Sequence, residues 1–468
     1  MSALSGVGAL FAGQLVFGIG AATLAALALV RAVRRMSPET HKRGVLLKDA
    51  VAWRRRILRG AAPSTLTLAA VPIAERDETK HFKLIGTTGT GKSTAIRELL
   101  GGAFGRGDRV VVADPDGGYY SRFFNRYRGD VVLNPFEPAS VKWNPLAEIR
   151  DSYDAAELAS GLIPSSSDPS ASEWRAYART FLAAVLRRCR ELNRGDPSDL
   201  WRLLAVASCE ELQPLVAGTP AQPFLELENA RMFGSIRSVA VSAIAAFEHV
   251  QAQRASPFAV RQWVRCGPSS GALFIPYKAN QIAALKSMIA TWMRIAIFEA
   301  MSGEEDRDQR LWFVIDELDA LGAIDGLKDA LARLRKFGGR CVLGFQSLAQ
   351  VSGTYGAADA QTIVENCSNT LILRCSASEN GGTSQFASRL IGEREVVRQQ
   401  VSRGRDREAA FTLRGSRRTE STSGQHVTEA AVMPSQIEQL PDFRGYLKTA
   451  SSRAWVRVSF GPKQSWRG

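Results

Sequence analysis

The feature that most constrains this fold is the segment Gly86-Thr87-Thr88-Gly89-Thr90-Gly91-Lys92-Ser93, which has the pattern G-x-x-x-x-G-K-S. A strand-like run from His81 to Ile85 precedes it, and a helical pattern from Thr94 to Leu100 follows. A strand, a glycine-rich loop and a helix in this order form a phosphate-binding loop. A plain turn would explain the glycines but not the flanking strand and helix. The sequence therefore predicts an α/β nucleotide-binding domain of the P-loop class.

The residue types of this loop match the chemistry of a nucleoside triphosphate site. Glycines let the backbone wrap phosphates, and amide hydrogens at the helix N-terminus meet their negative charge. We expect Lys92 to reach the β- and γ-phosphates and the Ser93 hydroxyl to bind Mg²⁺. The expected cofactors are ATP and Mg²⁺, with Gly86 to Thr94 as the nucleotide-binding residues.

Two acidic residues follow an apolar run later in the chain. Leu311 to Ile315 has the pattern of a buried parallel strand, and Asp316 and Glu317 come directly after it. We expect Asp316 to hold the magnesium shell and Glu317 to orient or deprotonate the attacking water. Alone, this pattern also fits a strand end that caps a helix, but beside a phosphate-binding loop it predicts catalytic acids.

Two further polar positions have two interpretations each. The strand-like run Cys341 to Phe345 ends at Gln346, whose amide either senses the γ-phosphate or satisfies loop backbone. The helix expected from Leu327 to Gly338 carries Arg333, Arg335 and Lys336 away from its apolar stripe. One of these cations either acts across a subunit boundary, as an arginine finger that neutralises transition-state charge does, or is only solvated.

The segment between the two nucleotide motifs changes character along its length. Arg109 to Ala113 and Asp130 to Leu133 are expected strands, and their alternation with helices predicts a parallel sheet that resumes at Ala272 to Ile275. From 148 to 259 helical periodicity dominates, which predicts an all-helical domain inserted into the sheet domain. The expected divisions are a membrane anchor (1–36), a linker (37–70), the first part of the nucleotide-binding domain (71–147), the helical domain (148–259) and the second part (260–468).

Basic residues on two segments have a functional and a neutral interpretation. The helix expected at Glu173 to Asn193 carries, opposite its apolar face, Arg175, Arg179, Arg187, Arg188 and Arg190. The segment from Glu393 to Arg418 holds Arg398, Arg403, Arg405, Arg407, Arg414, Arg417 and Arg418. Either these arginines meet DNA phosphates, or the first set only faces water and the second lies on an exposed hairpin or loop. The net charge of +14 favours an anionic partner, either nucleic acid or an acidic lipid surface.

The N-terminal segment is expected to cross a membrane. From Val7 to Val30 the sequence is apolar apart from Gln14 and Thr23, long enough for one helix across about 30 Å of hydrocarbon. A cleaved signal peptide fits less well, because no positive residue precedes the apolar stretch. Basic residues follow it, at Arg31, Arg34, Arg35, Lys42 and Arg43. This asymmetry predicts a single-pass protein with its ATPase body in the cytoplasm. The six cysteines, with no C-x-x-C pair, fit reduced thiols in that compartment.

With both nucleotide motifs, the helical insertion and the anchor, the chain resembles the TraD/TrwB coupling proteins of type IV secretion and conjugation. The likeness runs from about Val71 to Phe460, starting with His81-Phe82, Val112 to Gly117 and Leu133-Asn134-Pro135. It continues through Glu173-Trp174, Asp316-Glu317-Leu318, Gly344 to Ser347, and Met433-Pro434 to Leu440-Pro441.

The resemblance implies a RecA-like domain, a membrane-distal all-helical domain, and a homo-hexamer around a channel that carries DNA. It assigns phosphate and magnesium to Lys92 and Ser93, metal and water to Asp316 and Glu317, and sensing to Gln346. It also matches Arg335 to the trans-acting arginine, with Arg333 and Arg340 nearby. The implied partners are DNA, a relaxase–DNA complex, the proteins of a type IV secretion channel and the inner membrane. Family members commonly have two membrane helices, whereas this sequence offers one.

The leading hypothesis is that ATP hydrolysis pumps DNA, single-stranded and led by its relaxase, towards a secretion channel. A translocase of duplex DNA, as in the FtsK group, shares the motor class, but the all-helical insertion argues against it. A receptor that selects protein substrates and uses ATP as a conformational switch also stays open.

Overall fold

The computed structural model describes residues 39–50, 66–166, 168–193, 197–306, 308–378, 382–405 and 418–460. The expected membrane segment (1–36) and Arg407, Arg414 and Arg417 lie outside these ranges. Within the described ranges, no helix is both long and apolar enough to span a bilayer.

These residues form two compact units. One contains β1 (Glu39–Gly44), β14 (Glu393–Arg405) and β15 (Arg418–Ala430). The other contains the nucleotide motifs, the large sheet and the helices of the insertion. The segment expected as a linker, 37–70, includes β1, β2 (Leu46–Asp49) and β3 (Thr67–Leu68).

A ten-stranded sheet of described strands organises the second unit, in the order β2-β17-β16-β13-β5-β12-β11-β6-β10-β7. Besides β2, its strands are β5 (Phe82–Ile85), β6 (Arg109–Pro115), β7 (Val131–Val132), β10 (Gly271–Tyr277), β11 (Leu311–Ile315), β12 (Gly339–Phe345), β13 (Asn369–Ile372), β16 (Arg444–Lys448) and β17 (Ala454–Ser459). The strands from β13 to β7 pair in parallel, and β16 pairs antiparallel with β13 and β17. The predicted α/β fold with a parallel sheet is thus confirmed.

The central strands are apolar on both faces because helices cover both faces of a parallel sheet. Every residue of β5, β11 and β12 is buried. The core on one face includes Leu84, Val112 and Val314 from three strands, and Ile96 and Leu100 from α4. Short pairs of strands accompany the sheet: β3 with β4 (Val71–Pro72), and β8 (Lys142–Trp143) with β9 (Pro257–Phe258).

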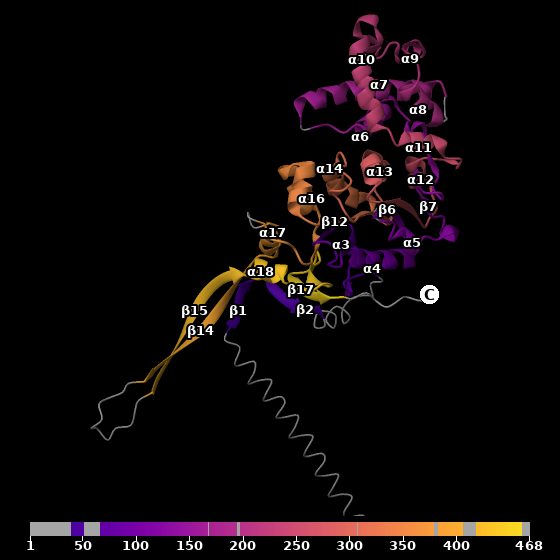
Figure 1. The fold of residues 1–468 in the computed structure, drawn as a ribbon. Coiled ribbons are helices and arrows are strands. Elements are labelled where there is room, and N and C mark those ends of the chain that lie inside the picture. The colour runs from indigo at the N-terminus through magenta and orange to yellow at the C-terminus, as the bar shows by residue number, and fades with distance from the viewer. Residues whose placement is uncertain are drawn as a thin grey trace, which may run out of the picture. The chain divides into compact units, whose positions relative to one another are not determined.

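Helices account for most of the described residues outside these strands (Figure 1). Their bounds are α3 (Glu75–Glu78), α4 (Lys92–Gly105), α5 (Tyr120–Phe123), α6 (Ser152–Leu162), α7 (Pro169–Glu191), α8 (Pro197–Ala205), α9 (Cys209–Val216), α10 (Ala230–Ala243), α11 (Phe247–Ala252), α12 (Val260–Cys266), α13 (Ile282–Glu299), α14 (Leu327–Leu334), α15 (Leu348–Tyr355), α16 (Ala357–Asn366), α17 (Gly382–Ile391) and α18 (Pro434–Glu438). Single 3₁₀ turns occur at η1 (Arg126–Arg128), η2 (Pro145–Glu148), η3 (Gln222–Leu225), η4 (Leu227–Asn229) and η5 (Arg335–Phe337).

The segment predicted to be helical, 148–259, contains α6 to α11, and α7 to α10 lie together in Figure 1. Asp168 caps the start of α7, because its carboxylate accepts a hydrogen bond from Ser170 N, and Pro169 fits the first helical position. The helix expected from Arg231 to His249 is two helices, α10 and α11. Phe247 N donates to Ile244 O, three residues back, so the chain tightens between them.

A buried carboxylate joins the two ends of this insertion. Glu148 lies where the chain enters it, and Glu148 accepts hydrogen bonds from the amides of Val260 (2.7 Å) and Arg261 (3.0 Å), where the chain returns. Glu148 thereby caps α12, and Trp143 Nε1 donates to the same carboxylate. Burial raises the pKa of Glu148.

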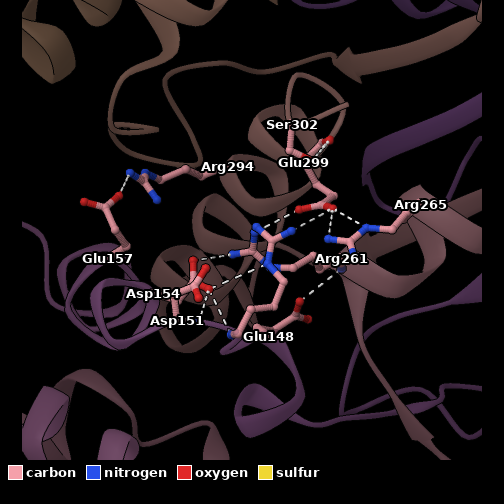
Figure 2. A network of polar contacts seen from close by, with 10 residues as sticks. Glu148, Asp151, Asp154, Glu157, Arg261, Arg265, Arg294, Glu299 and Ser302 are labelled. Atoms are coloured by element: carbon pink, nitrogen blue, oxygen red, sulfur yellow. Dashed lines mark hydrogen bonds and ion pairs between the residues drawn. The ribbon is translucent and has the colours of Figure 1, made fainter. Parts of the chain in front are cut away.

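Ion pairs continue this junction towards α13 (Figure 2). Glu299 at the end of α13 accepts from Arg150 (3.3 Å), Arg261 (2.8 Å) and Arg265 (2.7 Å). Arg261 also reaches Asp154 of α6 at 3.2 Å. Since a buried charge is costly unless it is paired, this shared network fixes α6, α12 and α13 against one another. The division of the chain at 148 and 259 into separate domains stays a prediction.

The other compact unit is an antiparallel sheet in the order β1-β14-β15. Its strands β14 and β15 pair along 13 residues each, from Glu393 opposite Ala430 to Arg405 opposite Arg418. Glu395 accepts from Lys42 and Arg43 of β1 and from His426 of β15, so hydrogen bonds to one carboxylate tie the three strands together. Of the arginine-rich segment, the described residues 393–405 and Arg418 therefore lie on these paired strands.

Candidate nucleotide-binding site

The predicted phosphate-binding loop joins β5 to α4 at the C-terminal edge of the parallel strands. Helix α4 begins at Lys92, two residues before the expected start, and its N-cap residue is Gly91. Gly89 and Gly91 have φ angles of 78° and 114°, in the region that favours glycine over residues with a side chain. The backbone thus turns tightly enough to aim the first amides of α4 at one point, as anion binding requires.

Lys92 lies inside this loop. Its Nζ donates to the main-chain oxygens of Gly86 (2.5 Å) and Thr87 (3.2 Å). Burial lowers the pKa of Lys92, because removal from water disfavours its charged form, while Asp316 and Glu317 act in the opposite direction. A buried ammonium at the N-terminus of α4 is suited to a polyanion such as a triphosphate.

Ser93 and Asp316 meet, although 223 positions separate them in the sequence. Ser93 Oγ donates to Asp316 Oδ2 at 2.6 Å. The other oxygen, Oδ1, is buried and accepts no hydrogen bond from the described residues. Gly344 of β12 makes room for the aspartate, since a Cβ there would lie 2.2 Å from Asp316 O. A hydroxyl beside a carboxylate with a free buried oxygen suits Mg²⁺, which takes hard oxygen ligands.

Glu317 and Gln346 lie next to each other at the ends of β11 and β12. Gln346 Nε2 donates to Glu317 Oε1 at 3.3 Å, and Thr88 Oγ1 donates to Gln346 Oε1 at 3.1 Å. The amide therefore bridges the phosphate-binding loop and the acid, through side chains at both ends. Burial, and secondly the charge of Asp316, raise the pKa of Glu317, as suits a general base.

Two residues of this site were not evident in the sequence. Tyr119 is 2% exposed, and its Oη donates to Asp316 Oδ2 at 2.7 Å. Asp114, at the end of β6, accepts from the amides of Tyr119 (3.0 Å) and Tyr120 (2.6 Å) and so holds that tyrosine in place. Burial, aided by the charge of Asp316, raises the pKa of Asp114 to about 6. The position of Asp114 at a strand end was a usable signal, but no spacing rule connects Tyr119 with Asp316.

The structure separates the candidate trans-acting arginines. Arg340 is 2% exposed and donates to Glu78 at 2.9 Å and to the main-chain oxygens of Gln309 and Gly338. Its role is therefore structural. Arg333 and Arg335 are exposed and form no ion pair with the residues that the structure describes. Helix α14 ends at Leu334, so Arg335 begins the 3₁₀ turn η5 rather than lying inside a longer helix.

The basic residues of α7 have local partners. Arg175 donates to Pro164 O at 3.0 Å, and Arg179 to Ser165 Oγ at 2.9 Å. Arg187 and Arg188 pair with Glu191 on the same helix. Exposed contacts of this kind stabilise a protein by less than about 1 kcal/mol, so they leave these cations available to an anionic partner.

Comparison of the sequence with known proteins shows the family to which the chain belongs. Residues 65–461 match the model of the type IV secretion-system coupling protein DNA-binding domain. The chain is 30% identical over 416 residues to the coupling protein TraD of Escherichia coli K12, covering 86% of this chain and 56% of TraD. It thus spans about half the length of the curated relatives that it matches.

Solved structures agree with the sequence comparison. The bacterial conjugative coupling protein TrwBdeltaN70 superimposes with a TM-score of 0.78 at 29% identity, covering 91% of this chain and 94% of that one. TrwB in complex with ADP and Mg²⁺ gives 0.77 at 29% identity, with coverages of 91% and 95%. TrwB bound to the ATP analogue ADPNP gives 0.77 at 30% identity, with the same coverages. These similarities support the RecA-like fold that the resemblance implied.

Proposed function

Because the chain belongs to the type IV secretion-system coupling protein DNA-binding domain family, we propose that it is an ATPase that couples ATP hydrolysis to DNA transport for type IV secretion. The observation that carries the proposal is the meeting of Ser93, Asp316, Glu317 and Gln346 beside the phosphate-binding loop. ATP and Mg²⁺ are the proposed cofactors, in keeping with the TrwB complexes.

The side chains divide the work of hydrolysis. Loop amides and Lys92 bind and orient the triphosphate, and the ammonium of Lys92 offsets negative charge on the terminal phosphates of the nucleotide. Ser93 and Asp316 would hold Mg²⁺, which when bound neutralises charge that develops on the phosphates. Glu317 takes the proton of the attacking water at a carboxylate oxygen, because its raised pKa makes it a better acceptor than an exposed glutamate. Gln346 positions Glu317 relative to the phosphate-binding loop, because its amide bonds to both Glu317 and Thr88.

The finer features of the proposal concern the assembly. We propose a homo-hexamer at the bacterial inner membrane that receives a relaxase–DNA complex and passes the DNA, as a single strand, to the secretion channel. Arg335 would act on the nucleotide of a neighbouring subunit, since it is exposed at the end of α14 and Arg340 is occupied by Glu78.

The experiment is ATP hydrolysis by the purified full chain with and without single- and double-stranded DNA. We expect stimulation by DNA that falls steeply with salt, because phosphate contacts release counterions. Lys92→Ala should lower hydrolysis by about 100-fold or more, whereas Lys278→Ala, which changes an exposed lysine, should not.

The outcome with DNA separates the competing functions. Hydrolysis that single-stranded DNA stimulates supports the conjugation motor, and stimulation by duplex DNA alone indicates a duplex translocase. Hydrolysis indifferent to both would refute the motor and favour a receptor for protein substrates.

A further inference from the structure

The segment 440–460 lies directly against the phosphate-binding loop. Phe443 N donates to Thr90 O at 2.9 Å, and Phe460 N donates to Phe443 O at 3.0 Å. A Cβ atom on Gly91 would lie 2.9 Å from Phe443 Cδ1 and 3.2 Å from Phe460 Cε2. Both rings therefore touch the loop at the residue immediately before Lys92.

One arginine fixes the loop and this segment to each other. Arg374 O accepts a hydrogen bond from Thr87 N at 2.9 Å, inside the loop. The guanidinium of the same residue pairs with Asp442 Oδ1 at 2.6 Å and donates to Leu440 O at 3.3 Å. The position of the aromatic rings relative to the loop is thus set by backbone hydrogen bonds at Thr87 and Thr90 and by the side-chain contacts of Arg374 with Asp442 and Leu440.

The two rings form an edge-on pair that is only half buried. Their centroids are 6.2 Å apart and their planes meet at 79°. Phe443 has a φ of 60°, a conformation that a bulky residue rarely adopts. Strained backbone of this kind persists where surrounding contacts hold it, and here the hydrogen bonds to Thr90 and Phe460 do so.

We propose that Phe443 and Phe460 form the surface on which the base of the bound nucleotide stacks. The proposal rests on the proposed function, since it places the base of the ATP that the loop binds. The loop amides and the N-terminus of α4 hold the phosphates, and the rings touch Gly91 of the same loop, so a base that extends from the phosphates on that side meets them.

The chemistry of a phenyl ring defines which bases it accepts. Its face attracts the flat surface of a base, and it has no donor or acceptor that reads the base edge. Adenine and guanine should therefore bind about equally, and the smaller pyrimidines should bind less tightly. The competing explanation is that the rings only close the core, because Phe460 also packs against the apolar cluster beneath the loop.

Calorimetric titration of the wild-type full chain with a ligand series, in EDTA and without Mg²⁺ so that no ligand is hydrolysed, gives the first test. We expect ATP and GTP to bind about tenfold more tightly than ribose 5-triphosphate, which corresponds to about 1.4 kcal/mol of stacking, with CTP between them. If ribose 5-triphosphate binds as tightly as ATP, the base has no surface on this protein and the proposal is wrong.

The second test uses Phe460→Leu, with Phe224→Leu as the matched control. Phe224 is also half buried in an aromatic contact, but it belongs to η3 of the helical insertion. We expect Phe460→Leu to weaken ATP and GTP about tenfold while inorganic tripolyphosphate binds unchanged, and Phe224→Leu to change none of them.

Parallel weakening of ATP and tripolyphosphate in Phe460→Leu would show that the rings merely support the loop, and would overturn the proposal. Unchanged binding of all three ligands would overturn it too. If the variant does not fold, the wild-type series decides alone. These measurements use neither DNA nor turnover, so failure of DNA-stimulated hydrolysis would contradict the proposed function without touching this result.

Discussion

The buried histidine at the start of the phosphate-binding strand supports a prediction about stability and pH. His81 is 1% exposed, its Nε2 lies 2.9 Å from Leu331 O, and its Nδ1 accepts from Cys341 N at 3.1 Å. A ring that accepts at Nδ1 and donates at Nε2 is neutral. Burial, with the charges of Arg335 and Arg340, lowers the pKa of His81 from 6.5 to about 4.

The magnitude follows from this shift. The folded-state pKa lies below the unfolded one, so the neutral ring contributes stability above pH 6.5, and that contribution is lost as the pH falls through about 4. A difference of about 2.5 pKa units corresponds to about 3 kcal/mol of unfolding free energy. This is a large part of the stability of an ordinary domain.

The perturbation is His81→Asn. Asparagine tolerates the φ of 54° at this position and does not titrate, so position 81 of the variant should add no pH dependence to its free energy of unfolding. Urea unfolding followed by tryptophan fluorescence, at steps from pH 7.5 to pH 4, gives the stability of both proteins. The advantage of the wild type should shrink by about 3 kcal/mol over this range. A constant difference, or a His81 ring signal that titrates near 6.5 by nuclear magnetic resonance, would refute the reasoning.

Three further predictions concern the nucleotide site. Glu317→Gln should lower kcat about 10²- to 10⁴-fold and leave ATP binding intact. The pH–rate profile of the wild type should fall on its acid side at a pH above that expected for an exposed glutamate, and this fall should be absent in Glu317→Gln. Tyr119→Phe should raise the Mg²⁺ concentration for half-maximal activity about tenfold, because Asp316 loses a hydrogen bond, whereas Tyr120→Phe should not; equal effects would contradict the role of Tyr119. Arg335→Ala subunits should fold normally and, when mixed with wild-type subunits, should lower ATPase activity by more than their share of the mixture. Arg340→Ala should instead lose about 3–5 kcal/mol of stability in thermal unfolding. A loss of activity in proportion to the share of Arg335→Ala subunits would show that Arg335 does not act on the neighbouring site.

Much of the fold was predictable because its signals are local. The strand β11 has the bounds expected from five consecutive apolar residues, and α9 those expected from its helical pattern. Other elements lack such signals. Helix α13 is apolar on nearly all sides, so it shows no stripe, and β16 is a short strand that gains its identity only by pairing with β13 and β17.

The sequence by itself determined the chemistry of the loop, since the glycines, Lys92 and Ser93 are adjacent in the chain and need only a strand and a helix beside them. It also placed Asp316, Glu317 and Gln346 at one sheet edge, because parallel strands end on the same side.

Only the tertiary structure decided which side chains share that edge and which are occupied elsewhere. It brought Tyr119 to Asp316, set Phe443 against Gly91, and assigned Arg340 to Glu78 while leaving Arg335 exposed. The physical reason is that such contacts depend on the reach and rotamer of side chains from distant elements, which no periodicity in the sequence encodes.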